Sequence, residues 1–206
     1  MDKAFVTFII PTIGRKTIEN TIKSLFYQTN PNWSAIIVID GVDIDLQIND
    51  NRFIINKIKK TGEKNHAGRV RNSAFEFVKT EWIAFVDDDD CLTNDYVEKL
   101  KEEILLNPDA STIIFRMNNN DLITRILPPP NCNNFESCKV GISFSIKKEL
   151  TDKYIFEPSH MEDYVLLDKI RTEKNKMVIS PYLTYLVNSD FINHTFSQSF
   201  NRVIIN

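Results

Sequence analysis

The chain opens with blocks of apolar residues that are separated by polar turns. Residues 4–10 are β-branched and aromatic and stop at Pro11, a pattern that predicts a strand. Residues 17–28 then place apolar side chains at three- and four-residue spacing, which predicts an amphipathic helix. Two further apolar runs, at 35–39 and 53–58, are bounded by polar residues and glycine, and they predict two more buried strands.

The alternation of helix and strand continues through the middle of the chain. Residues 67–78 gather apolar side chains on one face and predict a second helix, and residues 82–86 form an apolar strand that ends in four aspartates, Asp87 to Asp90. Residues 94–106 again show helical spacing. This third helix should end before Pro108, because a proline disfavours the helical conformation of the residue that precedes it.

The second half of the chain has a different pattern. The apolar runs 112–117 and 122–127 flank four polar residues and predict a hairpin. A loop rich in proline and asparagine follows at 128–134. Residues 162–171 predict a last helix and residues 182–187 a last strand, before an aromatic and polar tail.

The order of these elements predicts an α/β fold. Strands that alternate with helices favour a mostly parallel, doubly wound sheet flanked by helices, and the hairpin makes the sheet a mixed one. Ligands of such sheets bind at the carboxyl ends of the strands. The residues that directly follow the predicted strands are therefore the candidates for function, and they include Pro11, Thr12, Asp40 and the aspartate run 87–90.

Composition and charge exclude several classes of protein. With 206 residues, of which 42% are hydrophobic, the chain can bury one core, and we expect a single domain over residues 1–206. The net charge is −3 with both signs scattered, so no nucleic acid is expected as a partner. No apolar run reaches the length of a membrane span or of a signal-peptide core. We expect a soluble, cytoplasmic protein with no transmembrane segment.

The aspartate run 87–90 is the strongest chemical signal. Neighbouring carboxylates repel by roughly 4 kcal/mol per close pair at an effective dielectric constant of about 20, so a cation should offset them. Hard oxygen ligands select Mg²⁺ or Mn²⁺, which complete their shells with water and substrate phosphate oxygens. The alternative is an acidic surface turn that caps the helix starting near Asn94. The buried strand 82–86 directly before the run favours the metal site.

Two further clusters of charge start predicted helices. The helix that begins at Gly68 carries Arg69 and Arg71, and its polarity and charge suit an anionic ligand, although both arginines could equally be solvated. Glu162 and Asp163 form a second carboxylate pair. Acidic residues are common at helix starts because they suit the helix dipole, so this pair alone is not evidence of function.

Taken in order, these motifs resemble a known family. The chain is similar, over roughly residues 4 to 171, to the family-two inverting glycosyltransferases of the GT-A (nucleotide-diphospho-sugar transferase) fold. No single motif identifies this family, but five motifs in the family's order do so together. The motifs are Phe8 to Thr12, Ile36 to Gly41, Arg71-Asn72, Trp82 to Asp90 and Glu162 to Tyr164.

The resemblance implies a donor site for a nucleotide-sugar in residues 1–106. Pro11 and Thr12 would open the nucleotide pocket and Asp40 would contact the base. Asp87 to Asp89 would be the Asp-any-Asp element, in contact with the ribose and with Mn²⁺ or Mg²⁺. We expect metal ligands at Asp89 first, then Asp87 and the late His194. The other expected donor-binding residues are Gly14, Arg15, Arg69, Arg71 and Asp88.

The turn at residues 13–15 departs from the family pattern, which commonly has an aromatic residue and an asparagine there. Asp40 also lacks the doubled aspartate that is often found at its position. Both departures bear on the base of the donor, for which we expect a UDP-sugar rather than a GDP-sugar. The acceptor, a glycan or another hydroxyl compound, would bind in residues 107–206.

The implied reaction is one direct displacement at the anomeric carbon, which inverts its configuration. Asp163 would be the general base, with Glu162 orienting the acceptor hydroxyl. His66 and His160 receive no role. A runner-up is a phosphohydrolase that resembles the haloacid-dehalogenase group, with Asp87 as nucleophile, although that motif normally lies on the first strand of its chain. A third interpretation is a sugar- or nucleotide-binding module without turnover.

Overall fold

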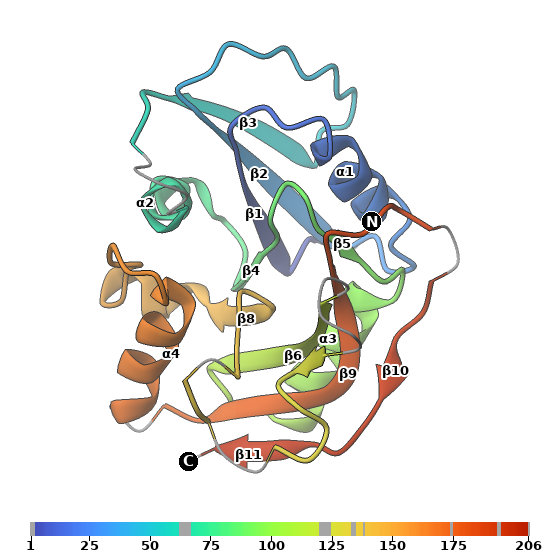
Figure 1. The fold of residues 1–206 in the computed structure, drawn as a ribbon, viewed down its shortest axis with the longest axis vertical. Coiled ribbons are helices and arrows are strands. Elements are labelled where there is room, and N and C mark those ends of the chain that lie inside the picture. The colour runs from blue at the N-terminus through green and yellow to red at the C-terminus, as the bar shows by residue number, and fades with distance from the viewer. Residues whose placement is uncertain are drawn as a thin grey trace.

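The computed structural model describes most of the chain, with short gaps. The described residues are 3–61, 67–119, 125–132, 135–137, 139–173, 175–192 and 195–205. Among them, eleven strands join in one mixed sheet, and helices pack against it (Figure 1). The main path of the sheet runs β10-β9-β6-β8-β4-β1-β2-β3. The α/β class and the mixed sheet predicted from the sequence are confirmed.

The first half of the chain forms the parallel part of the sheet. Its strands are β1 (Val6–Thr12), β2 (Trp33–Asp40), β3 (Phe53–Ile58) and β4 (Trp82–Phe85), and β1 pairs in parallel with both β2 and β4. Strand β1 is buried along its whole length because it lies between two neighbours and under helices on both faces. Figure 1 shows helix α1 (Ile18–Phe26) and helix α2 (Gly68–Asn72) on opposite sides of these strands.

Strand β1 continues through Pro11, where the sequence predicts its end. Its pairing with β4 stops at Ile9 and Phe85. The carbonyl of Ile9 faces β4, where it accepts a hydrogen bond from the N–H of Val86. Position 11, two residues further on, faces the same side beyond the end of β4, so a proline there removes no ladder hydrogen bond.

The single helix predicted over residues 67–78 is wrong in its extent. Helix α2 ends at Asn72, and a 3₁₀ turn, η1 (Phe75–Phe77), follows it. The ring of Phe75 turns inward and packs 6.4 Å from that of Phe85, and this tighter turn leaves Phe77 exposed. Helix α3 (Tyr96–Leu106) follows the expected pattern.

The second half of the chain adds strands that run in both directions. β6 (Thr112–Asn119) and β7 (Arg125–Leu127) form the predicted hairpin, whose connecting residues 120–124 lie outside the described part. The sequence analysis missed β8 (Phe144–Lys147), which lies antiparallel between β4 and β6. It also places the start of β9 (Met177–Val187) too late, because Ser180 and Pro181 interrupt the apolar pattern.

Short strands and one helix complete the structure. β5 (Cys91–Leu92), β10 (Gln198–Ser199) and β11 (Val203–Ile205) all pair with β9, so the polar tail is partly ordered as strand. Helix α4 (Glu162–Thr172) begins where the sequence predicts. No helix in the described part of the chain combines the length and the apolar character needed to cross a membrane.

Asn72 joins the two halves close to the carboxyl ends of the parallel strands. Its side-chain amide donates to the carbonyl of Phe156 at 2.8 Å and accepts from the N–H of Phe156 at 3.0 Å. This pair of hydrogen bonds ties helix α2 to the segment that leads into helix α4. Arg71 and Glu162, one on each of these helices, are thereby held opposite one another.

We predict that Asn72→Ala lowers the free energy of unfolding by about 1–3 kcal/mol, because it leaves both backbone groups of Phe156 without their partner. Urea unfolding measures this change. The matched control is Asn51→Ala, at an exposed asparagine in the turn before β3, which should change stability by less than about 0.5 kcal/mol. Equal losses in the two variants would contradict the role given to Asn72.

Candidate active site

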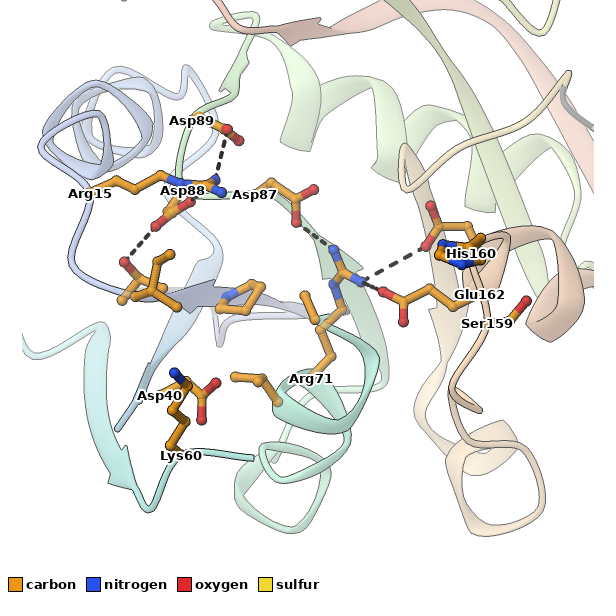
Figure 2. Close-up of a pocket in the computed structure, with 16 residues that line it drawn as sticks. Arg15, Asp40, Lys60, Arg71, Asp87, Asp88, Asp89, Ser159, His160 and Glu162 are labelled. Carbon is orange, nitrogen blue, oxygen red and sulfur yellow. Dashed lines mark hydrogen bonds and ion pairs between the residues drawn. The ribbon is translucent and has the colours of Figure 1, made fainter. Parts of the chain in front are cut away.

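A cavity of about 520 Å³ opens at the carboxyl ends of β1, β2 and β4. Helix α2 and the start of helix α4 form its other side (Figure 2). Most of the residues singled out in the sequence line it, although they are spread over some 150 positions. They are Pro11, Thr12, Arg15, Asp40, Arg71, Asp87, Asp88, Asp89, Glu162 and Asp163.

Three of the expected site residues are not among those that line the cavity. Gly14 stands in the chain between the lining residues Ile13 and Arg15, where its φ of +88° shapes the turn and its N–H donates to Thr12 Oγ1 at 3.0 Å. Arg69 is exposed on the outer side of helix α2, so the structure does not bring it to the cavity. His194 lies outside the described residues.

The four aspartates after β4 have different surroundings. Asp88 is buried, and its two oxygens accept hydrogen bonds from Thr12 Oγ1 at 2.6 Å and from Arg15 Nη1 at 2.9 Å. Burial raises the pKa of Asp88, against these two interactions, which lower it. The sequence could not separate these neighbours, because the turn alone decides which carboxylate faces inward.

Asp90, which the sequence analysis names only as part of the aspartate run, is buried. Its Oδ1 accepts from the N–H of Asn188 at 2.9 Å. Burial, followed by the charge of Asp87, raises its pKa to about 7, although hydrogen bonds from Tyr185 and Asn188 act in the opposite direction. Asp90 is therefore held in place by β9, in a region where its charged form is disfavoured.

The aspartate turn has the donor atoms that a divalent cation needs. One oxygen from each of Asp87, Asp89 and Asp90 lies within 4.8 Å of the others. Carboxylate oxygens are the preferred ligands of Mg²⁺ and Mn²⁺, and a small set of them leaves coordination positions for substrate oxygens. These three residues therefore fit a magnesium or manganese ion, and the fit includes Asp87 and Asp89, the two aspartates that the sequence analysis nominated.

Arg71 is the buried cation of the cavity, with 3% of its side chain exposed. Its Nη2 donates to Asp87 at the end of β4, and its Nη1 donates to Glu162 Oε1 at 2.7 Å. The Oδ1 of Asp163 is 3.9 Å from the same Nη1. One guanidinium thus connects the aspartate turn with both carboxylates at the start of helix α4 (Figure 2).

Glu162 and Asp163 are held differently. Glu162 Oε2 accepts from the N–H of Gly68 at 3.1 Å, so the start of helix α2 binds this carboxylate. Asp163 has 26% of its side chain exposed to the cavity, but its Oδ1 is buried and accepts no hydrogen bond from the described residues. Burial raises the pKa of Asp163 to about 7; Arg71 lowers it, while Asp87 and Glu162 add to the rise.

Asp40 occupies the far end of the cavity, where β2 ends. It is buried, and its Oδ1 accepts hydrogen bonds from the N–H and the hydroxyl of Thr61, at 2.7 and 3.3 Å. Lys60 lies beside it in Figure 2. The other lining residues were not nominated from the sequence. Val70 lies in helix α2, where the sequence pattern predicts only an apolar face, and the rest lie outside the helices and strands: Ile13, Lys60, Ala67, Ser159 and His160.

This combination of fold and site is that of a glycosyltransferase. The family model described as glycosyl transferase family 2 matches residues 7–161, about three quarters of the chain, and the chain belongs to this family. A curated relative from Escherichia coli, the UDP-Glc:alpha-D-GlcNAc-diphosphoundecaprenol beta-1,3-glucosyltransferase WfgD, is 26% identical over 191 residues. That match covers 87% of this chain and 75% of the relative.

Other relatives extend the comparison. The putative teichuronic acid biosynthesis glycosyltransferase TuaG of Bacillus subtilis (strain 168) is 32% identical over 110 residues, which cover 48% of this chain and 42% of TuaG. The crystal structure of S. aureus TarS 1-349 matches 88% of this chain with a TM-score of 0.69 and 17% identity. This likeness confirms the predicted GT-A fold. The chain spans only 60% of that TarS chain.

The comparisons do not favour the phosphohydrolase alternative. The family match is to glycosyltransferases. Asp87 also follows β4, the fourth strand along the chain, whereas the nucleophile of a haloacid-dehalogenase-like enzyme normally follows the first.

The raised pKa of Asp163 predicts a pH-dependent stability. A carboxyl whose pKa is about 7 in the folded chain and about 3.9 when unfolded binds its proton more tightly in the folded state. Its protonation therefore stabilises the fold below pH 4, and this contribution is lost as the pH rises to about 7. Asp163→Asn should remove this loss of unfolding free energy with rising pH. For one proton the loss is at most roughly 1.4 kcal/mol per pH unit.

Urea unfolding of wild type and of Asp163→Asn between pH 5 and 8 measures this difference. Asp152→Asn is the matched control, because 81% of the Asp152 side chain is exposed, and it should follow wild type. If the free energy of unfolding changes with pH equally in wild type and in Asp163→Asn, the raised pKa of Asp163 is contradicted.

Proposed function

We propose that this chain is a metal-dependent, inverting glycosyltransferase that moves a hexosyl group from a UDP-sugar to an acceptor hydroxyl in glycan synthesis. The observation that carries the proposal is the link through Arg71 between the aspartate turn and the Glu162-Asp163 pair. It places the residues expected to hold the donor and those expected to activate the acceptor on opposite walls of one cavity.

The donor would lie along the carboxyl ends of β1, β2 and β4. Asp40 would bind the base, with Pro11 and Thr12 lining the pocket at the end of β1. Two printed names support UDP as the nucleotide: the E. coli relative is a UDP-Glc-dependent enzyme, and TarS 1-349 has a structure in complex with UDP-GlcNAc. Asp87, Asp89 and Asp90 would hold Mn²⁺ or Mg²⁺, and the ion would neutralise charge on the departing diphosphate.

The acceptor would enter from the side of helix α4. Asp163 lines the cavity and part of its side chain is exposed there, so its carboxylate can take the proton of an acceptor hydroxyl. Its pKa of about 7 suits a base that works near neutral pH. Glu162 is fixed by Gly68 and Arg71 and would orient the hydroxyl. Attack from this wall, opposite the diphosphate, inverts the anomeric carbon.

The roles of the two halves follow from this arrangement. Residues 1–106 would bind the donor and residues 107–206 would shape the acceptor site, within a single domain. The remaining alternative is a module that binds a nucleotide-sugar without turnover. A binding module needs no general base opposite the donor, so a substitution of Asp163 distinguishes it from the transferase.

We predict that Asp163→Asn lowers the transfer rate by roughly 10² to 10⁴-fold, the usual contribution of a positioned general base. Asparagine keeps the shape of the side chain and removes the proton acceptor, so the affinity for UDP in the presence of Mn²⁺ should stay close to that of wild type. The measurements are UDP release from a panel of UDP-sugars with added acceptors, and the anomeric configuration of the product by NMR.

Asp168→Asn provides a matched control, because Asp168 lies on the same helix and pairs with Arg171. It should retain transfer. Transfer by Asp163→Asn at the wild-type rate would show that another residue is the base, and a product of retained configuration would contradict the single displacement. Binding of UDP-sugars with no transfer by wild type would favour the binding module.

A further inference from the structure

Two arginines contact the aspartate turn, one from each side. Arg71 holds Asp87 from helix α2, and Arg15 reaches the turn from the loop that follows β1 (Figure 2). Nη1 of Arg15 donates to Asp88 Oδ1 at 2.9 Å and to Asp89 Oδ2 at 2.8 Å. Arg15 therefore neutralises part of the charge at Asp89, the aspartate that the proposed function uses first as a metal ligand.

The two arginines differ in how firmly they are held. Arg71 is buried and is also bound to Glu162, so moving it would leave several carboxylates without a counter-charge. The side chain of Arg15 is 44% exposed, and that of Asp89 is 31% exposed. Exposed ion pairs of this kind contribute little to stability. The Arg15–Asp89 pair can therefore be exchanged at low cost, whereas the Arg71–Asp87 pair is a fixed part of the site.

The contact with Asp88 gives Arg15 a pivot. Asp88 is buried and is held by the hydroxyl of Thr12, so its carboxylate stays in place whatever happens at Asp89. An arginine that remains paired with Asp88 can turn its guanidinium from Asp89 into the cavity, which it already lines. A guanidinium in that position faces the space where phosphate oxygens would lie, and it matches them with paired N–H donors.

We propose that Arg15 and the divalent cation compete for Asp89, and that Arg15, once displaced, binds the diphosphate of the donor. This inference rests on the proposed function and extends it. Arg15 opposes binding of the cation alone and favours binding of the cation together with a nucleotide diphosphate. The site thereby discriminates against a bare metal ion and takes up the cation and the donor as a pair.

The test separates these two effects because they have opposite signs. In Arg15→Gln, the affinity for Mn²⁺ without nucleotide should rise about 3- to 10-fold, since a competing positive charge is removed. The affinity for UDP at saturating Mn²⁺ should fall about 10-fold or more, since a charge-assisted contact to the diphosphate is lost. Electron paramagnetic resonance of free Mn²⁺ gives the first value, and isothermal titration calorimetry gives the second.

Three variants serve as controls. Lys16→Gln removes a neighbouring exposed cation and should leave both affinities unchanged. Arg15→Lys keeps the charge and should bind Mn²⁺ like wild type, with an intermediate loss of UDP affinity. Asp89→Asn should lose Mn²⁺ binding with and without UDP.

The outcomes distinguish the two proposals. Mn²⁺ affinity in Arg15→Gln that equals or falls below wild type, while Asp89→Asn still loses the metal, would overturn the competition and leave the proposed function standing. An Mn²⁺ affinity that Asp89→Asn does not alter would instead contradict the metal site of the proposed function itself. The rise in Mn²⁺ affinity together with the fall in UDP affinity supports the role given to Arg15.

Discussion

The burial of Arg71 among carboxylates is the interaction on which the rest of the site depends. Asp87, Glu162 and Asp163 come from elements some 75 positions apart, and their charges would drive the two walls of the cavity apart without a cation between them. Arg71 contacts all three groups, and its neighbour Asn72 ties the backbone of helix α2 to Phe156 before helix α4. The carboxyl ends of the parallel strands and the start of helix α4 thereby become a single site.

The arrangement divides the charged residues into a fixed set and an exchangeable set. Arg71 and Glu162 are buried or mostly buried and hold one another, so they set the distance between the walls. Arg15 and Asp89 lie closer to solvent, and we propose that they change partners when a substrate enters.

The sequence predicted β1, β2 and β4 well because these strands lie inside the sheet and are buried, so that each is a largely apolar run. The prediction of a buried strand at 53–58 was wrong, because β3 is the last strand on its side of the sheet path and Ile54 and Ile55 are exposed. Strand β8 was missed since it is only four residues long and includes Ser145, whose hydroxyl is bonded to Tyr96 inside the core. Residues that directly follow strands could be nominated as site residues from the sequence. The sequence could not predict that Asp90 faces inward, or that Arg69 and Arg71 point in different directions. These features depend on contacts with the end of β9 and with helix α4, far along the chain.

The central claim is that the aspartate turn binds a divalent cation together with the diphosphate of a nucleotide-sugar. Anomalous X-ray diffraction from crystals grown with UDP and Mn²⁺ tests it most directly, because the manganese signal locates the ion independently of the nucleotide. The expected result is one manganese peak within about 2.5 Å of carboxylate oxygens of Asp87 and Asp89, with the diphosphate of UDP on its other side. A manganese ion away from this turn, or a UDP molecule bound in the cavity with no ion between its diphosphate and the aspartates, would contradict the account.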